Sequence, residues 1–144
     1  MEKINFQDLP STDTPINSTN LNQMQANIEE EITPVSYDIS NTPEHSAGTN
    51  IYQLTKTGKI VSLNVNAIWL NSITENTWLS FGTIPEGIIP TKTQNATAIL
   101  TEGGNGNIIG YAKVESSPDR SLKFKPNIAY TKLCSSSFSM VWTL

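Results

Sequence analysis

The chain has 144 residues, a length typical of one main domain. Only 15% of its residues are charged, against about 25% in an average globular protein. The net charge of −4 and the pI near 4.9 lack the basic footprint that a nucleic-acid binder needs. The polarity comes instead from 17 Thr, 15 Ser and 15 Asn, beside 16 Ile. Because Thr and Ile favour strands while Asn and Ser favour turns, this composition predicts a mainly β protein.

Three features of the sequence bear on where the chain acts. Cys134 is the single cysteine, which excludes a scaffold held by intrachain disulfides. No apolar run approaches the ~18 residues of a membrane span, so we expect no membrane insertion. The first ten residues, MEKINFQDLP, lack the basic and apolar regions of a secretion signal. We therefore expect synthesis in a cytoplasm and, for any extracellular role, release by another route such as lysis.

The N-terminal residues differ from the rest in composition and charge. Residues 1–17 contain two prolines and several Ser, Thr and Asp, which predicts an extended arm. Ile4, Phe6 and Leu9 give this arm apolar contacts at roughly strand spacing, so we expect it to dock on a partner. Residues 1–50 carry eight acids and one base, a net charge of −7, whereas residues 51–144 carry five acids and eight bases, a net charge of +3. The two parts are expected to have different roles.

Residues 18–32, STNLNQMQANIEEEI, are predicted to form the one helix, capped by Asn17 or Ser18 and ended by Pro34. A helix of this length is marginal alone in water, so its apolar side must pack on something. The alternatives are docking on its own β domain and self-association into a short bundle. Self-association is favoured because the apolar seam is narrow and lies outside the β region, although two helical repeats would need help from the β domain. The seam recurs at intervals of three and four residues, as in coiled coils: Leu21, Met24, Ile28 and Ile32.

Residues 33–50 hold two prolines and one glycine and are predicted to form a linker with a short strand at Val35–Ile39. From residue 51 the hydrophobic pattern has a period of two. It is clearest over Lys59–Leu70, where Val61, Leu63, Val65, Ala67 and Trp69 share one face. Turns are expected at Thr57-Gly58, at residues 103–106 and at residues 117–119, and Thr83–Pro90 is expected to be a loop that crosses between sheets. The other predicted strands are Tyr52–Lys56, Thr77–Gly82, Asn95–Thr101, Asn107–Glu115, Ser121–Lys125, Ile128–Leu133 and Phe138–Thr143. Eight strands at this spacing predict an antiparallel β-sandwich or jelly-roll head domain over residues 51–144.

Residues with catalytic or metal-binding chemistry are few. His45 is the one histidine and lies in the linker, so we expect no metal site of the ordinary kind and no cofactor. His45 and Cys134 formally offer a base and a nucleophile, but Cys134 is better interpreted as a small apolar filler. A glycosidase needs two placed carboxylates, whereas the acids of the β region lie in or next to predicted turns: Glu75, Glu86, Glu102, Glu115 and Asp119. We therefore expect that the protein is not an enzyme.

A saccharide-binding role has better support, because aromatic faces beside neutral amides and hydroxyls suit sugar rings. Core packing is the alternative for each aromatic residue. It is favoured for Trp69 and Trp142, which lie on apolar faces, and only slightly for Trp78 at the start of a strand. Asp119-Arg120 at a hairpin tip is either a solvated turn or a pair that faces a ligand. The candidate saccharide contacts are Trp78, Tyr111, Asp119 and Arg120.

Two sequence patterns suggest a family. The segment Ile4–Ile32 contains the run D-x-P-S-T-x-T-P-I-N-x-x-N-L-N-x-M-Q, which extends from Asp8 to Gln25. The β region contains a looser glycine, tryptophan and proline pattern, formed by Gly58, Val61, Leu63, Trp78, Gly82, Thr83, Pro85, Gly87 and Pro90. Over about half its length the chain thus resembles tail-fibre, baseplate and receptor-binding proteins of phages that infect Gram-positive bacteria. The resemblance implies a homotrimer with a short helical bundle and a β head that binds host cell-wall polysaccharide or teichoic acid.

The leading hypothesis is therefore a non-enzymatic virion protein, a trimeric adhesin, baseplate or tail-fibre component that contacts other tail proteins through its arm. Leu21, Met24 and Ile28 would form the three-fold seam, and the slightly basic β domain would suit an anionic wall polymer. Such a protein is made in the host cytoplasm and released by lysis. The alternative is a purely structural virion part, such as a neck, collar or tail connector, without glycan binding. A hydrolase of wall polymers ranks third, since it needs two acids that face one cleft.

Overall fold

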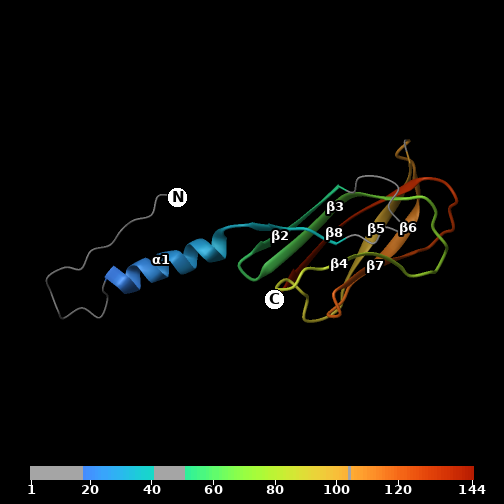
Figure 1. The fold of residues 1–144 in the computed structure, drawn as a ribbon. Coiled ribbons are helices and arrows are strands. Elements are labelled where there is room, and N and C mark those ends of the chain that lie inside the picture. Colours follow the sequence, from blue (N-terminus) through green and yellow to red (C-terminus); the bar gives the residue numbers. More distant parts are fainter. Residues whose placement is uncertain (1–17, 41–50, 104) are drawn as a thin grey trace.

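The computed structural model describes residues 18–40, 51–103 and 105–144 (Figure 1). The predicted docking arm with Ile4, Phe6 and Leu9, and also His45, lie outside the described residues. The elements within the described ranges are α1 (Ser18–Ile32), β1 (Val35–Tyr37), β2 (Ile51–Thr57), β3 (Ile60–Leu70), β4 (Leu79–Thr83), β5 (Gln94–Glu102), β6 (Ile108–Ser116), β7 (Ser121–Pro126) and β8 (Cys134–Thr143).

The strands form one antiparallel sheet in the order β1-β2-β3-β8-β5-β6-β7-β4. The sheet curls until its two halves face each other, because Phe138 of β8 packs edge-on against Phe81 of β4 with ring centroids 5.6 Å apart. The ends of the sheet also meet, since the Thr83 N–H at the end of β4 donates to the Ser40 carbonyl beyond β1 at 2.9 Å. The predicted fold class, mainly antiparallel β with one short helix, is confirmed.

The space between the two halves holds the hydrophobic core. Strands β6, β7 and β8 alternate between inward and outward residues, with Val114, Leu122 and Phe124 almost fully buried. Trp142 is buried as predicted, and its indole N–H donates to the carbonyl of Ile88 at 2.8 Å. Ile88 lies in the long connection that crosses from β4 to β5, so this bond ties the crossing loop to the core.

A bulge changes the predicted face of one tryptophan. The pairing of β3 with β8 shifts between Val65 and Ile68, and an extra residue in one strand reverses the alternation beyond it. Ile68 and Leu70 are consequently buried, while Trp69 is only partly buried and lies on the outward face. The prediction that Trp69 packs in the core is therefore wrong.

The predicted strand Ile128–Leu133 is also wrong. This segment is a loop with one isolated bridge, between Tyr130 and Ile73 in the connection after β3, and its Leu133 carbonyl accepts the Gly103 N–H at 2.8 Å. After Pro126 the Asn127 side chain accepts the Tyr111 N–H at 2.8 Å, so a side chain takes the place of the backbone partner and the ladder ends. The last strand begins at Cys134 rather than at Phe138, and it is longer than the pattern predicted.

The predicted linker contributes to the sheet. The short strand expected within Val35–Ile39 is present as β1, which pairs with β2. Ile39 is buried, and its backbone N–H donates to the Tyr52 hydroxyl at 2.9 Å. A Cβ on Gly82 would lie 2.3 Å from the Ile39 side chain, so a glycine is required where this segment crosses β4. The folded head thus begins before residue 51.

Helix α1 matches its predicted range and extends away from the sheet (Figure 1). No residue of α1 is buried, and Met24, Ile28 and Ile32 are 58%, 55% and 51% exposed. The helix ends where the Thr33 N–H donates to the Glu29 carbonyl at 3.0 Å, just before Pro34. In the described residues, the apolar seam of α1 does not dock on the chain's own head.

One buried polar atom generates a stability prediction. The Ser116 hydroxyl at the end of β6 is fully buried and has no hydrogen-bond partner among the described residues. An unsatisfied buried hydroxyl is destabilising, so Ser116→Ala should raise the free energy of unfolding by about 1 kcal/mol. The control Leu122→Ala, opposite Ser116 on β7, should lower it by about 2–5 kcal/mol. Urea denaturation of both variants measures the effects, and a loss of stability in Ser116→Ala would show that the hydroxyl has a partner.

Candidate binding site

Trp78 lies immediately before β4 and is surrounded by lysines from the two neighbouring strands. The ammonium groups of Lys123, Lys113 and Lys125 lie 5.3, 5.7 and 6.0 Å from the centre of its ring. The side chain is 39% exposed, so the core interpretation of Trp78 is wrong. We call Trp78, Lys113, Lys123 and Lys125, together with Glu115 beside them, the lysine–tryptophan cluster.

The alternation of β6 and β7 places these lysines on the outer face. Val114 on β6 and Phe124 on β7 point into the core, so their neighbours in sequence point outward. The register puts Lys113 directly opposite Lys125. It also puts Glu115 opposite Lys123. The sequence suggested none of these lysines as a site, because the register between the two strands is a tertiary feature.

The charges within the cluster do not balance. Glu115 is bonded to Lys113 at 2.6 Å and lies 3.9 Å from Lys123. Lys125 has no carboxylate within 4.0 Å among the described residues. Two like charges directly opposite each other on adjacent strands are destabilising. The sheet therefore holds a local excess of positive charge at a cost to its stability.

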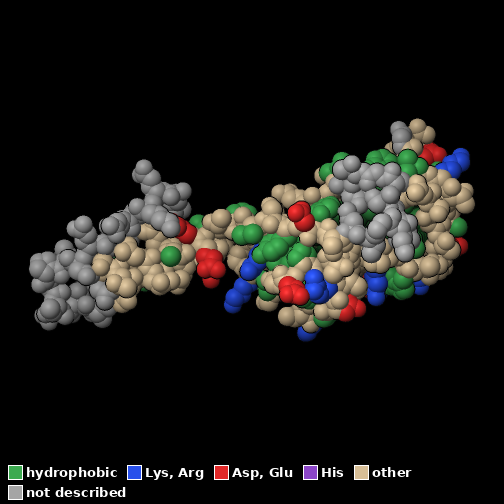
Figure 2. Space-filling view, in the orientation of Figure 1, with side chains coloured by type: hydrophobic (Ala, Val, Ile, Leu, Met, Phe, Trp, Pro, Cys, Tyr) green, Lys and Arg blue, Asp and Glu red, His purple; other side chains and the backbone are tan. Residues whose placement is uncertain are grey.

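Tyr111 extends the same outer face along β6. Tyr111 precedes Lys113 by two residues on β6, so both side chains lie on the outer face, and Tyr111 is exposed. Ile99 of β5 lies opposite Tyr111. Two of the four predicted saccharide contacts, Trp78 and Tyr111, thus flank Lys113. On the face drawn in Figure 2, basic side chains occur as small separate groups among uncharged polar surface. On this face, positive charge is local rather than spread over a broad patch.

Asp119 and Arg120 lie at the other end of β6 and β7, in the turn between them. Asp119 accepts bonds from the Ser121 hydroxyl at 2.6 Å and the Ser121 N–H at 2.9 Å, and these bonds lower the pKa of its carboxyl. Arg120 has a left-handed backbone with φ of 71°. Its guanidinium donates to the Ile84 carbonyl at 3.0 Å and to Glu86 at 2.9 Å. Both side chains hold loops in place, and Lys123 of the lysine–tryptophan cluster also contributes by its charge to lowering the pKa of Asp119.

At the end of the sheet away from α1, a carboxylate connects two loops (Figure 1). The Tyr130 hydroxyl donates to Glu102 at 2.8 Å, and the Asn105 amide donates to the same carboxylate at 3.3 Å. The bond from Tyr130 is the main cause that lowers the pKa of Glu102, and it raises the pKa of Tyr130 in turn. This contact fixes the loop after β7 against the β5–β6 turn.

The candidate catalytic groups among the described residues each have structural contacts of their own. Burial raises the pKa of the Cys134 thiol to about 11, which leaves little thiolate at neutral pH. Glu86, Glu102, Glu115 and Asp119 are each bonded to different neighbours. Among the described residues there is no cluster of three potential metal ligands. The described part of the chain also has no helix long and apolar enough to cross a membrane.

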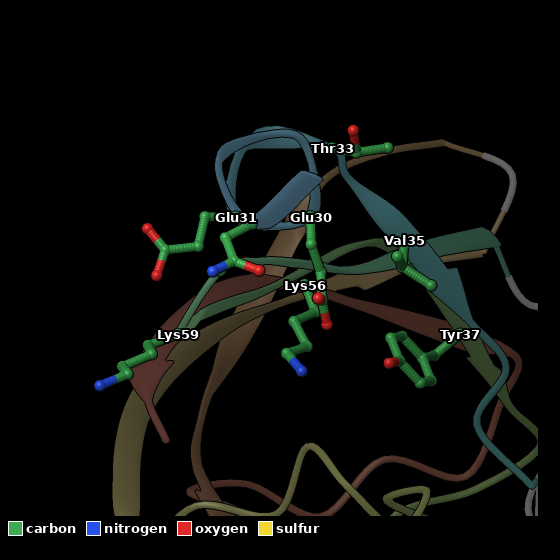
Figure 3. Close-up of a pocket in the computed structure, with 9 residues that line it drawn as sticks. Glu30, Glu31, Thr33, Val35, Tyr37, Lys56 and Lys59 are labelled. Atoms are coloured by element: carbon green, nitrogen blue, oxygen red, sulfur yellow. The ribbon is translucent and has the colours of Figure 1, made fainter. Parts of the chain in front are cut away.

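A groove of about 450 Å³ lies between the last turns of α1 and strands β1 and β2 with the turn that follows β2 (Figure 3). Glu30, Glu31, Lys56 and Lys59 give it charges of both signs, and in Figure 3 Lys56 points into it while Lys59 extends away. Gly58 also lines it, and a Cβ there would lie 3.0 Å from the Glu31 carbonyl oxygen. The groove is thus the joint at which the helix meets the head.

The Glu102–Tyr130 bond predicts a change in titration. In Tyr130→Phe the carboxylate loses its main donor, so the pKa of Glu102 should rise toward its ordinary value. A carboxyl whose folded pKa is depressed stabilises the fold above its unfolded pKa, and that stability is lost as the pH falls through the folded pKa. The variant should therefore lose stability at neutral pH and lose less in acid. Carbon-detected NMR titration measures the pKa, with Tyr52→Phe as control; an unchanged pKa would mean that other donors suffice.

Comparison with known proteins relates this fold to phage proteins. No family model matches the chain, and no curated protein matches its sequence. The head domain of phage bIL170, described with the receptor-binding domains of lactococcal phages, is similar with a TM-score of 0.63 and 16% identity, over 78% of this chain and 99% of that chain. The receptor-binding protein gp15 of Listeria phage PSA is similar with a TM-score of 0.55 and 11% identity, over 88% of this chain and 75% of that chain. The resemblance to receptor-binding proteins of phages that infect Gram-positive bacteria is confirmed at the level of the fold: the chain has the fold of a phage receptor-binding head domain.

Proposed function

We propose that the protein is a homotrimeric receptor-binding component of a phage tail, in a baseplate or tail fibre, that adheres to saccharide or teichoic acid of the host cell wall. The observation that carries the proposal is an exposed aromatic and basic cluster, centred on Trp78, on a head of this fold. A flat indole face offers a stacking surface for a sugar ring, and the surrounding ammonium groups donate hydrogen bonds. Binding and not catalysis is the proposed activity.

The trimer is proposed because α1 leaves its apolar seam in water. Met24, Ile28 and Ile32 are each more than half exposed, whereas a helix of 15 residues gains most of its stability from packing. Two or more copies that bury this seam against each other would supply that packing. A bundle of three copies would hold three heads on one axis, so several weak sites would act together.

The proposed virion attachment uses the N-terminal part of the chain. The arm with Ile4, Phe6 and Leu9 would dock on other tail or baseplate proteins, and the heads would extend toward the host. In this proposal the chain is made in the host cytoplasm, and lysis releases the assembled particle.

The trimer proposal predicts the effect of a charge in the seam. Ile28→Asp should dissociate the oligomer at micromolar concentration, because three carboxylates would be buried around one axis. Sedimentation velocity measures the mass of the full chain. The matched control is Asn27→Asp, which adds the same charge at an exposed position outside the seam and should leave the mass unchanged. An unmodified chain that sediments as a monomer would contradict the proposal.

The receptor proposal predicts that wall binding depends on Trp78. Trp78→Ala should weaken binding to purified host cell walls about tenfold or more, the loss expected for a central aromatic contact. Arg120→Gln, in the turn at the other end of the strands, should retain binding. Pull-down on walls with and without teichoic acid provides the measurement. If the unmodified chain does not bind walls, a structural role as neck, collar or connector replaces this proposal, and release of wall fragments would indicate a hydrolase.

A further inference from the structure

We infer that the lysine–tryptophan cluster is a binding site for an oxyanion carried by a saccharide polymer, and that Glu115 occupies the place of that oxyanion in the unbound protein. The inference rests on the proposed receptor-binding function, because it names the ligand chemistry of the same site. It also assigns Glu115 a role of its own, as an internal competitor of the ligand.

The first argument is the arrangement of like charges. Lys113 and Lys125 lie directly opposite each other, and Lys123 is two residues from Lys125 on the same outer face. All three ammonium groups lie within 6.0 Å of one ring centre. Surface lysines are long and flexible and ordinarily spread away from one another in water. The face of the indole attracts ammonium groups, so Trp78 gathers the three lysines at one place, where a single anion can contact all of them.

The second argument is the position of Glu115. Its carboxylate is bonded to Lys113 at 2.6 Å, and its side chain is only 16% exposed. It lies 3.9 Å from Lys123, so one oxyanion already approaches two of the three ammonium groups. Lys125 stays without a carboxylate among the described residues. A ligand oxyanion would contact Lys125 and displace Glu115 from its neighbours.

The third argument is the rigidity of the support. The inward neighbours Val114, Leu122 and Phe124 are almost fully buried, so the strands that carry the lysines cannot move independently of the core. The indole of Trp78 is partly exposed, and the ammonium groups of the three lysines lie over its ring. A ligand that combines a sugar ring with a nearby phosphate diester or carboxylate would use both features. A neutral sugar would use the indole alone.

Global attraction does not explain such binding, because the chain as a whole carries a net charge of −4. A polyanion is repelled by the acidic residues 1–50 and is attracted only within about a Debye length of the cluster. The three lysines therefore act as a local filter for ligands that place an oxyanion next to a ring.

The test uses the full chain and three probes of similar length: an oligomer of glycerol phosphate, an oligogalacturonate and a neutral dextran oligomer. Lys125→Gln should weaken binding of the anionic probes about fivefold, and Glu115→Gln should strengthen it by a similar factor. Lys92→Gln, in the loop before β5, removes an equal charge away from the cluster and should have no effect. Dextran binding should not respond to any of the three substitutions. Isothermal titration calorimetry measures the affinities, and the preferred anionic probe identifies phosphate or carboxylate as the source of the oxyanion.

The decisive result is the opposite effect of the two cluster variants. A Glu115→Gln variant that binds the anionic probes more weakly, or equal affinities in all variants, would overturn the inference. Thermal unfolding controls for misfolding, since Lys125→Gln removes a like-charge contact and should not lower the melting temperature. Host walls that bind all variants equally would leave the receptor function intact and reject the oxyanion site. If the anionic probes bind but host walls do not, the oxyanion site is retained and the receptor function is rejected.

Discussion

The packing of the two halves of the curled sheet against each other is the constraint on which the rest of the structure depends. Phe81 contacts Phe124 and Phe138 at centroid distances of 5.6 Å, so a strand at one end of the sheet is joined to strands of both halves. Because these inner positions are occupied by large apolar side chains, only one set of alternate residues on β6 and β7 can face the core. The outward positions of Lys113 and Lys125 follow from that alternation. A slip of one residue would bury the lysines and expose the core, and it is therefore strongly disfavoured.

The helix obeys a different constraint, since none of its residues is buried by the described part of the head. Its polar faces are supported locally, as in the bond from the Gln23 amide to Asn27 at 2.8 Å, but such pairs contribute only tenths of a kcal/mol. The joint with the head is close at one point, where Gly58 approaches the Glu31 carbonyl. The chain thus combines a head that completes its core alone with a helix whose apolar side is left for a partner. This division matches the contrast in charge between the acidic N-terminal residues and the slightly basic head.

Local sequence signals predicted most of the elements. The helix range, the turn at Gly58 and seven of the eight β-region strands correspond to elements of the structure. The failures have particular physical causes. The bulge in β3 turned Trp69 outward, and the Asn127 side chain ended the ladder where the pattern of Ile128–Leu133 suggested another strand. Neither cause leaves a period in the sequence, because each is a contact between residues far apart in the chain.

The candidate site divides in the same way. The sequence by itself determined the mainly β class, the amphipathic helix and the presence of aromatic residues beyond the needs of a small core, because composition and periodicity are local properties. It also suggested Trp78 and Tyr111, which the fold places on either side of Lys113. Only the tertiary structure decided that three lysines meet at the indole of Trp78 and that Glu115 lies among them. The physical reason is that strand register is fixed by packing across the whole sheet, and residues separated by 35 to 47 positions become neighbours only once that register is set.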